Sequence, residues 1–252
     1  MYKRIIPSVL LKNGNAVKGK QFNSWRQACD VISYTKTLSH KMADEINIIN
    51  LDRNISQTTT SIIKLISENI SCPLSYGGGI RDEADIKKLN KLSIDRYILG
   101  SLSYSAEDRN KLTRIFDLVG NAALSSSIDL FEENGNFYRL DHDLNDFHKI
   151  NVPDYINYQI ELGFSEVIIT SINGDGLMKN IENCFHDFLT KINCKNKLVI
   201  AGGIGKPSDI VEWLEIDSVV AVMIGSALIY SRFTISDFHN EGLRKGLRLR
   251  SL

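Results

Sequence analysis

The chain has 252 residues, of which 43% are hydrophobic and 24% are charged, proportions typical of a soluble globular protein. Its formal net charge is zero at pH 7, so bulk electrostatics give no reason to expect nucleic acid or an anionic membrane as partner. No apolar run approaches the length of a membrane span, and the first residues lack a signal-peptide pattern. We therefore expect a cytoplasmic protein.

Short apolar runs alternate with segments of helical period, which is the pattern of a parallel sheet buried on both faces. The expected strands are 4–11, 45–51, 73–78, 95–101, 121–130, 166–171, 197–202 and 219–226. The expected helices are 24–41, 55–70, 82–93, 105–117, 152–163, 179–192, 207–216 and 233–245. This alternation predicts an α/β fold, a (β/α)8 TIM barrel forming one domain over residues 1–252. A Rossmann fold would need a GxGxxG fingerprint after the first strand, and none is present.

Two stretches interrupt the alternation, and both follow strands. Residues 12–22 are polar and contain glycine, as expected of a mobile active-site loop. Residues 131–140 contain Asn134-Gly135 between alternating residues, which predicts a hairpin. In a barrel both stretches would lie on the C-terminal face, where the chemistry of this fold class is carried out.

A glycine-rich motif occurs twice, half a chain apart. The run 76–81 (YGGGIR) is repeated as 201–205 (AGGIG), and each copy is followed by a strand with a second glycine, in 97–102 (YILGSL) and 222–227 (VMIGSA). The repeat predicts a half-barrel internal duplication, with halves at about 1–120 and 121–245. The basic run 244–250 is expected to be a solvated C-terminal tail, with contact to a partner or lipid as the alternative.

The repeated glycines predict binding of a phosphate-bearing small molecule. Glycine at the end of a strand lets a bound group approach the backbone closely, and the backbone N–H groups there suit an anion. The expected phosphate-binding residues are Gly78, Gly79, Gly100, Ser101, Gly202, Gly203, Gly225 and Ser226.

Asp129 ends the fifth predicted strand and is a candidate general acid or base, with capping of the following loop as the alternative. The repeat pairs its position with Leu10, so the second carboxylate of an acid/base pair is missing. Asp175 follows the sixth strand and could face the ligand, although its Asp-Gly sequence also fits a turn. Lys18 and Asn50 are candidate ligand contacts. A solvated lysine and a loop hydrogen bond are the respective alternatives.

Four charged residues open strands at the opposite end of the barrel: Arg4, Glu45, Arg96 and Glu166. Two positive and two negative side chains could pair with one another and close the barrel floor. The alternative is a set of separate salt bridges around the rim.

The cysteines Cys29, Cys72, Cys184 and Cys194 form no C-x-x-C pair, and no histidine lies at metal-ligand spacing. We expect small buried cysteines in a reducing compartment, and neither a metal nor a cofactor.

Taken together, these residues resemble the cyclase subunit of imidazole glycerol phosphate synthase, the HisF family. The resemblance runs almost end to end and is carried by 4–7, 18–19, Phe22, 44–45, 73–80, 127–129, 161–163, 170–172, 175–176 and 202–203. It implies a barrel with two phosphate sites and a glutaminase docked at the N-terminal face. Ammonia would pass up the barrel core, and the resemblance assigns its gate to the four charged residues of the floor.

The departures from the family pattern concern the other end of the barrel. The family's cyclase chemistry uses two aspartates; Asp129 matches one, and Leu10 occupies the position of the other. Loss of one member of such a pair costs a factor of about 10² to 10⁴, because leucine cannot exchange a proton. Asn50 replaces an aspartate, Leu177 a threonine and Gly100 an asparagine. The ammonia end thus keeps the family pattern, and the substrate end does not.

This combination resembles the branch of the family associated with surface glycans, in which barrel and glutaminase supply ammonia to a sugar amidotransferase that forms an acetamidino group. The first alternative is a true cyclase subunit, a lyase of histidine biosynthesis, in which Asp175 or a water assists Asp129. The second is a barrel of the related sugar-phosphate isomerase type, which also calls for a carboxylate on the first strand. These readings differ on whether the barrel is itself an enzyme.

Overall fold

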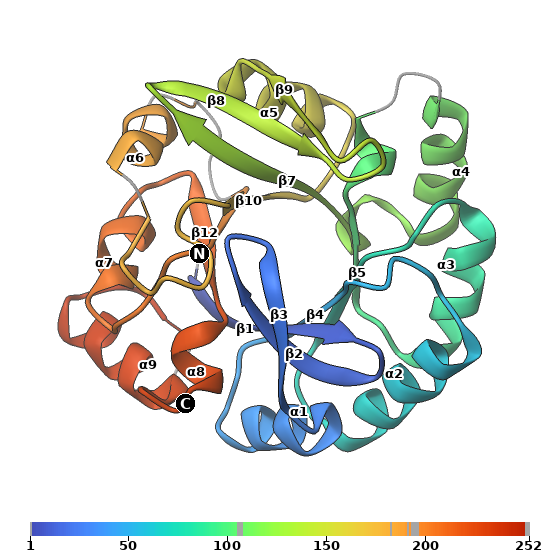
Figure 1. Cartoon of the computed structure of the whole chain (residues 1–252), viewed down its shortest axis with the longest axis horizontal. Coiled ribbons are helices and arrows are strands. Elements are labelled where there is room, and N and C mark those ends of the chain that lie inside the picture. The colour runs from blue at the N-terminus through green and yellow to red at the C-terminus, as the bar shows by residue number, and fades with distance from the viewer. Residues whose placement is uncertain (1, 105–107, 182, 191, 193–196, 250–252) are drawn as a thin grey trace.

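The computed structural model describes residues 2–104, 108–181, 183–190, 192 and 197–249. Parallel strands close into a ring, and Figure 1 shows the helices arranged around it. In ring order the strands are β1 (Arg4–Lys12), β4 (Ile46–Asn50), β5 (Leu74–Gly77), β6 (Arg96–Leu99), β7 (Leu124–Glu133), β10 (Glu166–Ser171), β11 (Leu198–Ala201) and β12 (Val219–Ile224), and β12 pairs with β1. The predicted TIM barrel is confirmed. The first residues of the helix expected from residue 105 lie outside the described part of the chain, as does Cys194.

The helices of the described residues follow the strands in the alternation that the sequence predicts. They are α1 (Val31–His40), α2 (Gln57–Asn69), α3 (Glu83–Leu89), α4 (Arg109–Val119), α5 (Val152–Glu161), α6 (Asn183–Leu189), α7 (Asp209–Leu214), α8 (Ser226–Ile229) and α9 (Ile235–Arg244), with short 3-10 turns η1 (Asn90–Leu92), η2 (Ser101–Ser103) and η4 (Asn121–Ala123). None of them is long and apolar enough to cross a lipid bilayer.

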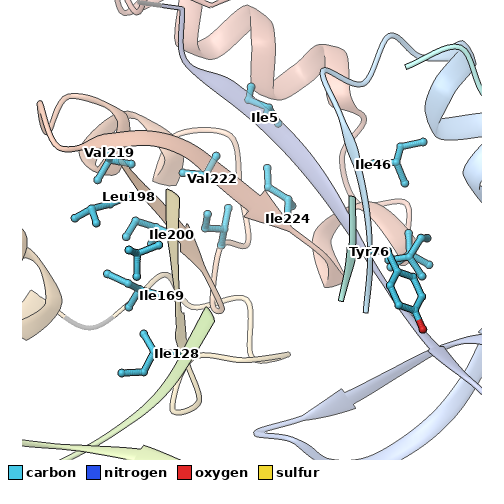
Figure 2. Close-up of a cluster of buried hydrophobic side chains, with 14 of the residues drawn as sticks. Ile5, Ile46, Tyr76, Ile128, Ile169, Leu198, Ile200, Val219, Val222 and Ile224 are labelled. Carbon is cyan, nitrogen blue, oxygen red and sulfur yellow. The ribbon is translucent and has the colours of Figure 1, made fainter. Parts of the chain in front are cut away.

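The strands are apolar because both of their faces are covered. One set of alternating residues, among them Ile5, Tyr76 and Ile200, packs in a large buried cluster that also includes helix residues such as Ile63 (Figure 2). A second, smaller cluster on the other set includes Ile6. Complete burial of a side chain of this size stabilises the fold by about 1.5 to 3 kcal/mol. The alternation also brings polar residues to the two ends of the barrel.

The segment after β1 differs from its prediction. Residues predicted as a loop and as the start of a helix instead form an antiparallel hairpin of β2 (Asn15–Lys20) and β3 (Asn23–Cys29). The helix begins later, where the Asp30 carboxylate accepts a hydrogen bond from Ser33 N at 2.7 Å and caps α1. In Figure 1 this hairpin projects over the centre of the ring.

The predicted hairpin after β7 is confirmed. Asn134 and Gly135 have φ values of 52° and 76°, which a tight two-residue hairpin turn requires. β8 (Asn136–Asp141) pairs antiparallel with β7, and β9 (Asp146–Lys149), which the sequence analysis did not predict, extends the ribbon.

The two glycine motifs adopt the same backbone conformation. Gly78 and Gly202 have φ values of 94° and 87°, and an added Cβ would lie 2.2 Å and 2.4 Å from a carbonyl oxygen of the preceding barrel strand. Gly100 and Gly225 also match, with φ and ψ of −93° and −98° against −110° and −80°. This correspondence is what an internal duplication would produce.

The basic residues Arg244, Lys245 and Arg248 are exposed, as expected, but the C-terminal segment is anchored to the start of the chain. Lys3 N donates to Arg248 O at 2.7 Å, and Leu249 is only 3% exposed. Arg250, the last residue of the basic run, lies outside the described residues. The buried state expected of the cysteines is also wrong in part, because Cys29, Cys72 and Cys184 are only partly buried.

Candidate functional site

A cavity of about 1080 Å³ opens at the C-terminal ends of the barrel strands. It is lined by all of the residues predicted for catalysis, phosphate binding and ligand contact, and by Leu10. It also contains charged or titratable side chains that the sequence analysis did not select, among them Arg53, Arg139, His142 and Asp143. The cavity is where loops from both halves of the chain meet.

Asp129 is paired with His142 in this cavity. The Asp129 carboxylate lies 2.6 Å from His142 Nε2, and both side chains are largely buried. Burial lowers the pKa of His142, but the hydrogen bond to Asp129 and its negative charge outweigh this and raise the pKa above its usual value. A carboxylate and an imidazole in direct contact can hold and exchange a proton.

The turn of the β2 and β3 hairpin covers this pair. The Phe22 ring stacks on the His142 ring with centroids 6.2 Å apart and planes 20° apart. The same turn contacts the loop after β10, where Gln21 N donates to Asp175 O at 2.9 Å and Phe22 N donates to the Asp175 carboxylate at 3.5 Å. Asp175 therefore holds the hairpin over the cavity as well as lining it.

Lys18 is buried inside the cavity, so the alternative of a solvated lysine is wrong. Only 6% of the residue is exposed, and its amine donates to Ser8 O at 3.5 Å. Burial lowers its pKa to about 8, with the charge of Asp175 acting in the opposite direction. Burial in turn raises the pKa of Asp175, which the charge of Lys18 opposes. The amine lies directly beside Gly225, where an added Cβ would come within 2.3 Å of it.

Asn50 is engaged by its neighbours. Its side-chain amide donates to Asn54 O at 2.7 Å and to the Tyr76 hydroxyl at 3.0 Å, and its side-chain oxygen accepts from Asp52 N. These bonds match the alternative of a loop hydrogen bond, and they leave Asn50 in the cavity wall.

At the opposite end of the barrel the four predicted charged residues form one connected ring. Arg4 contacts Glu45 and Glu166, each at 2.6 Å. Arg96 contacts Glu166 at 3.3 Å and Glu45 at 3.9 Å. All four side chains are at least 80% buried, so the alternative of separate rim salt bridges is wrong.

A chain of polar side chains leads from this end of the barrel toward the cavity. Asn47 donates to Ser75 Oγ at 3.2 Å, and its side-chain oxygen accepts from Ser8 Oγ at 3.2 Å. Ser8 and Asn47 are also part of the cavity wall. The barrel interior is therefore not uniformly apolar between its two ends.

Residues 4–234 match the family described as Histidine biosynthesis protein. The chain belongs to this family. An imidazole glycerol phosphate synthase subunit HisF from Dehalococcoides mccartyi is 25% identical over 251 residues, covering 98% of each chain. A Campylobacter jejuni protein, provisionally named imidazole glycerol phosphate synthase subunit hisF2, is 29% identical and covers 99% of this chain and 98% of its own. A phosphoribosyl imidazole-4-carboxamide isomerase from Buchnera aphidicola is 25% identical and covers 92% and 96%.

His142 is the main residue of this HisF-like site that sequence reasoning missed. Histidines were considered only as metal ligands, and no group of three or more His, Cys, Asp or Glu in the described residues could hold a metal. The hairpin signal could have found it, because pairing around Asn134-Gly135 sets Leu130 opposite Arg139. The residues that follow Arg139, His142 among them, then lie near Asp129.

Proposed function

We propose that this HisF-like chain is the ammonia-conducting subunit of a glutamine-dependent amidation system in the cytoplasm. A glutaminase docks at the N-terminal face, and its ammonia passes the floor and travels up the barrel. It then serves a sugar amidotransferase that forms an acetamidino group during surface-glycan synthesis. The observation that carries the proposal is the contrast between a complete floor ring and Leu10 in a cavity that keeps Asp129.

The floor supports the proposal through its electrostatics. Two guanidinium groups and two carboxylates in mutual contact balance one another's charge, so the ring is a closed but polar barrier. A docked partner that competes for one ion pair would loosen it. Neutral ammonia could then pass and hydrogen-bond to Asn47, Ser75 and Ser8 on its way to the cavity.

The pair of Asp129 and His142 favours a second candidate, a cyclase subunit of histidine biosynthesis. Ring-forming chemistry needs groups that move protons, and His142 could supply one that Leu10 cannot. We place this candidate second because an imidazole in a hairpin turn differs in reach and position from a carboxylate on β1. A barrel of the sugar-phosphate isomerase type has less support than either, because Leu10 stands where this type requires a carboxylate on the first strand.

A reconstitution with the glutaminase subunit of the same organism tests the partner. The isolated chain should not hydrolyse glutamine, and adding it should raise the activity of the glutaminase. Asp95 is an exposed residue that directly precedes Arg96 of the floor ring, and Asp95→Lys should abolish this stimulation by breaking the docking face. Asp146→Asn, an exposed residue of β9 outside the cavity, is the control and should leave it unchanged. Stimulation that survives changes at the floor would contradict the proposed docking.

A further inference from the structure

The two glycine motifs have different charged neighbours, although their backbones match. At the C-terminal motif, the buried amine of Lys18 lies beside Gly225 and forms no salt bridge with any residue that the structure describes. An ammonium group has three hydrogens to donate, and a single contact at 3.5 Å leaves this one under-used. A positive charge held in a cavity wall in this way is a built site for an anion.

In the N-terminal half, the corresponding cations are already paired. Arg53 Nη2 lies 3.4 Å from Ser101 Oγ, next to Gly100, and 2.6 Å from the Asp143 carboxylate. Arg81, which follows the first glycine motif, lies 3.5 Å from the same carboxylate oxygen. A side chain of the protein thus supplies the negative charge in this half of the cavity.

The turn that carries Asp143 is held in place by its own hydrogen bonds. Asp141 Oδ1 accepts from Asp143 N at 3.0 Å and from Leu144 N at 3.1 Å. The carbonyl oxygen of His142 also accepts from Arg53, so two consecutive residues bind the same guanidinium. The carboxylate is therefore preorganised against the arginines, even though this side of the cavity is half-exposed to solvent.

We propose that Asp143 is a built-in anion that occupies the N-terminal phosphate position, so that the cavity binds a ligand with one phosphate group, held at Lys18. A second phosphate would have to displace Asp143 from Arg53 or sit beside a carboxylate of the same charge. Both cost binding free energy, whereas a phosphate at Lys18 gains a charge-assisted hydrogen bond without a competing carboxylate in contact. The ligand class is a phosphomonoester, and a bisphosphate is disfavoured. This inference concerns the cavity alone and does not depend on the ammonia pathway.

Binding of inorganic phosphate to the full-length chain, measured by equilibrium dialysis at low ionic strength, tests the inference. The wild type should bind one equivalent. Lys18→Met should weaken that binding by on the order of tenfold to a hundredfold, the range expected for a lost hydrogen bond to a charged group. Lys20→Met, a change on the same strand at an exposed position outside the cavity, is the matched control and should bind as the wild type does.

Asp143→Asn is the decisive variant, because it keeps the size of the side chain and lies at an exposed turn where folding should be unaffected. It should bind a second equivalent of phosphate, and Asp146→Asn in the same ribbon should not. Two equivalents in the wild type, one equivalent that Lys18→Met leaves intact, no binding at all, or no second site in Asp143→Asn would each overturn the inference.

Discussion

The contact between Asp129 and His142 gives the cavity a group that can change its charge near neutral pH. The histidine pKa is held up by the carboxylate against the effect of burial. We expect an NMR titration to find the His142 pKa above the usual value of about 6.5. Asp129→Asn should lower the pKa, since the hydrogen bond and the charge that mainly oppose the effect of burial would be lost. The Asp146→Asn control should leave it unchanged, and an identical His142 titration in Asp129→Asn would show that the contact is absent.

The pKa of Lys18 predicts how the affinity of the cavity for an anion depends on pH. Its pKa of about 8 means that the free protein carries the charge below that pH and loses it above. Phosphate affinity should therefore fall as pH rises from 8 to 10, approaching a tenfold loss per unit where the amine is mostly neutral. Lys18→Met should show weak binding without this dependence. Phosphate affinity that is flat over this range in the wild type would contradict the buried amine as the cation.

At the scale of elements, the β2 and β3 hairpin is held over the cavity by a close backbone contact. Gly176 has a φ of 72°, and an added Cβ would lie 2.2 Å from Gly19 O. Gly176→Ala should therefore push the hairpin away and destabilise the protein by more than the roughly 1 to 2 kcal/mol that a left-handed alanine costs.

Gly135→Ala is the matched control for this change. Its φ of 76° is similar, but nothing lies within 4 Å of the added methyl group. Urea unfolding and proteolysis of the hairpin should distinguish the two variants. Equal losses of stability would mean that backbone strain alone matters and that the contact with Gly19 is unimportant.

Much of this architecture is readable from the sequence, because each barrel strand is an apolar run covered on both faces. The ends of the predicted strands were therefore enough to place Asp129, Asp175 and the glycines at the C-terminal face of the barrel. Residues 24–29 were predicted as helix but belong to β3, because this strand is ordered by pairing with β2 and its sequence shows no strand periodicity. The burial of Leu249 depends on its meeting Gly242, a tertiary contact with no local signal.

At the scale of the whole molecule, the floor ring joins residues at the starts of four strands spread over much of the chain. Arg4→Met would leave the buried carboxylates of Glu45 and Glu166 without one of their two cations. Removing one partner from such a buried set typically destabilises by about 3 to 5 kcal/mol. We expect urea unfolding to show a loss of this size.

Lys64→Met is the control for Arg4→Met. The salt bridge between Lys64 and Glu68 is exposed, so losing it should lower the free energy of unfolding by at most about 1 kcal/mol. A floor variant as mild as this control would mean that water already reaches the ring. The floor would then not be a closed barrier in the resting protein.

Formation of imidazole glycerol phosphate from the cyclase substrate and a high concentration of ammonium salt decides most directly between a conduit and a cyclase. Free ammonium bypasses the glutaminase and the floor, so only the chemistry of the cavity is measured. We expect no turnover by the wild type, and recovery in Leu10→Asp, which restores a carboxylate on β1. Turnover by the wild type at the rate of an authentic cyclase would contradict the proposed role.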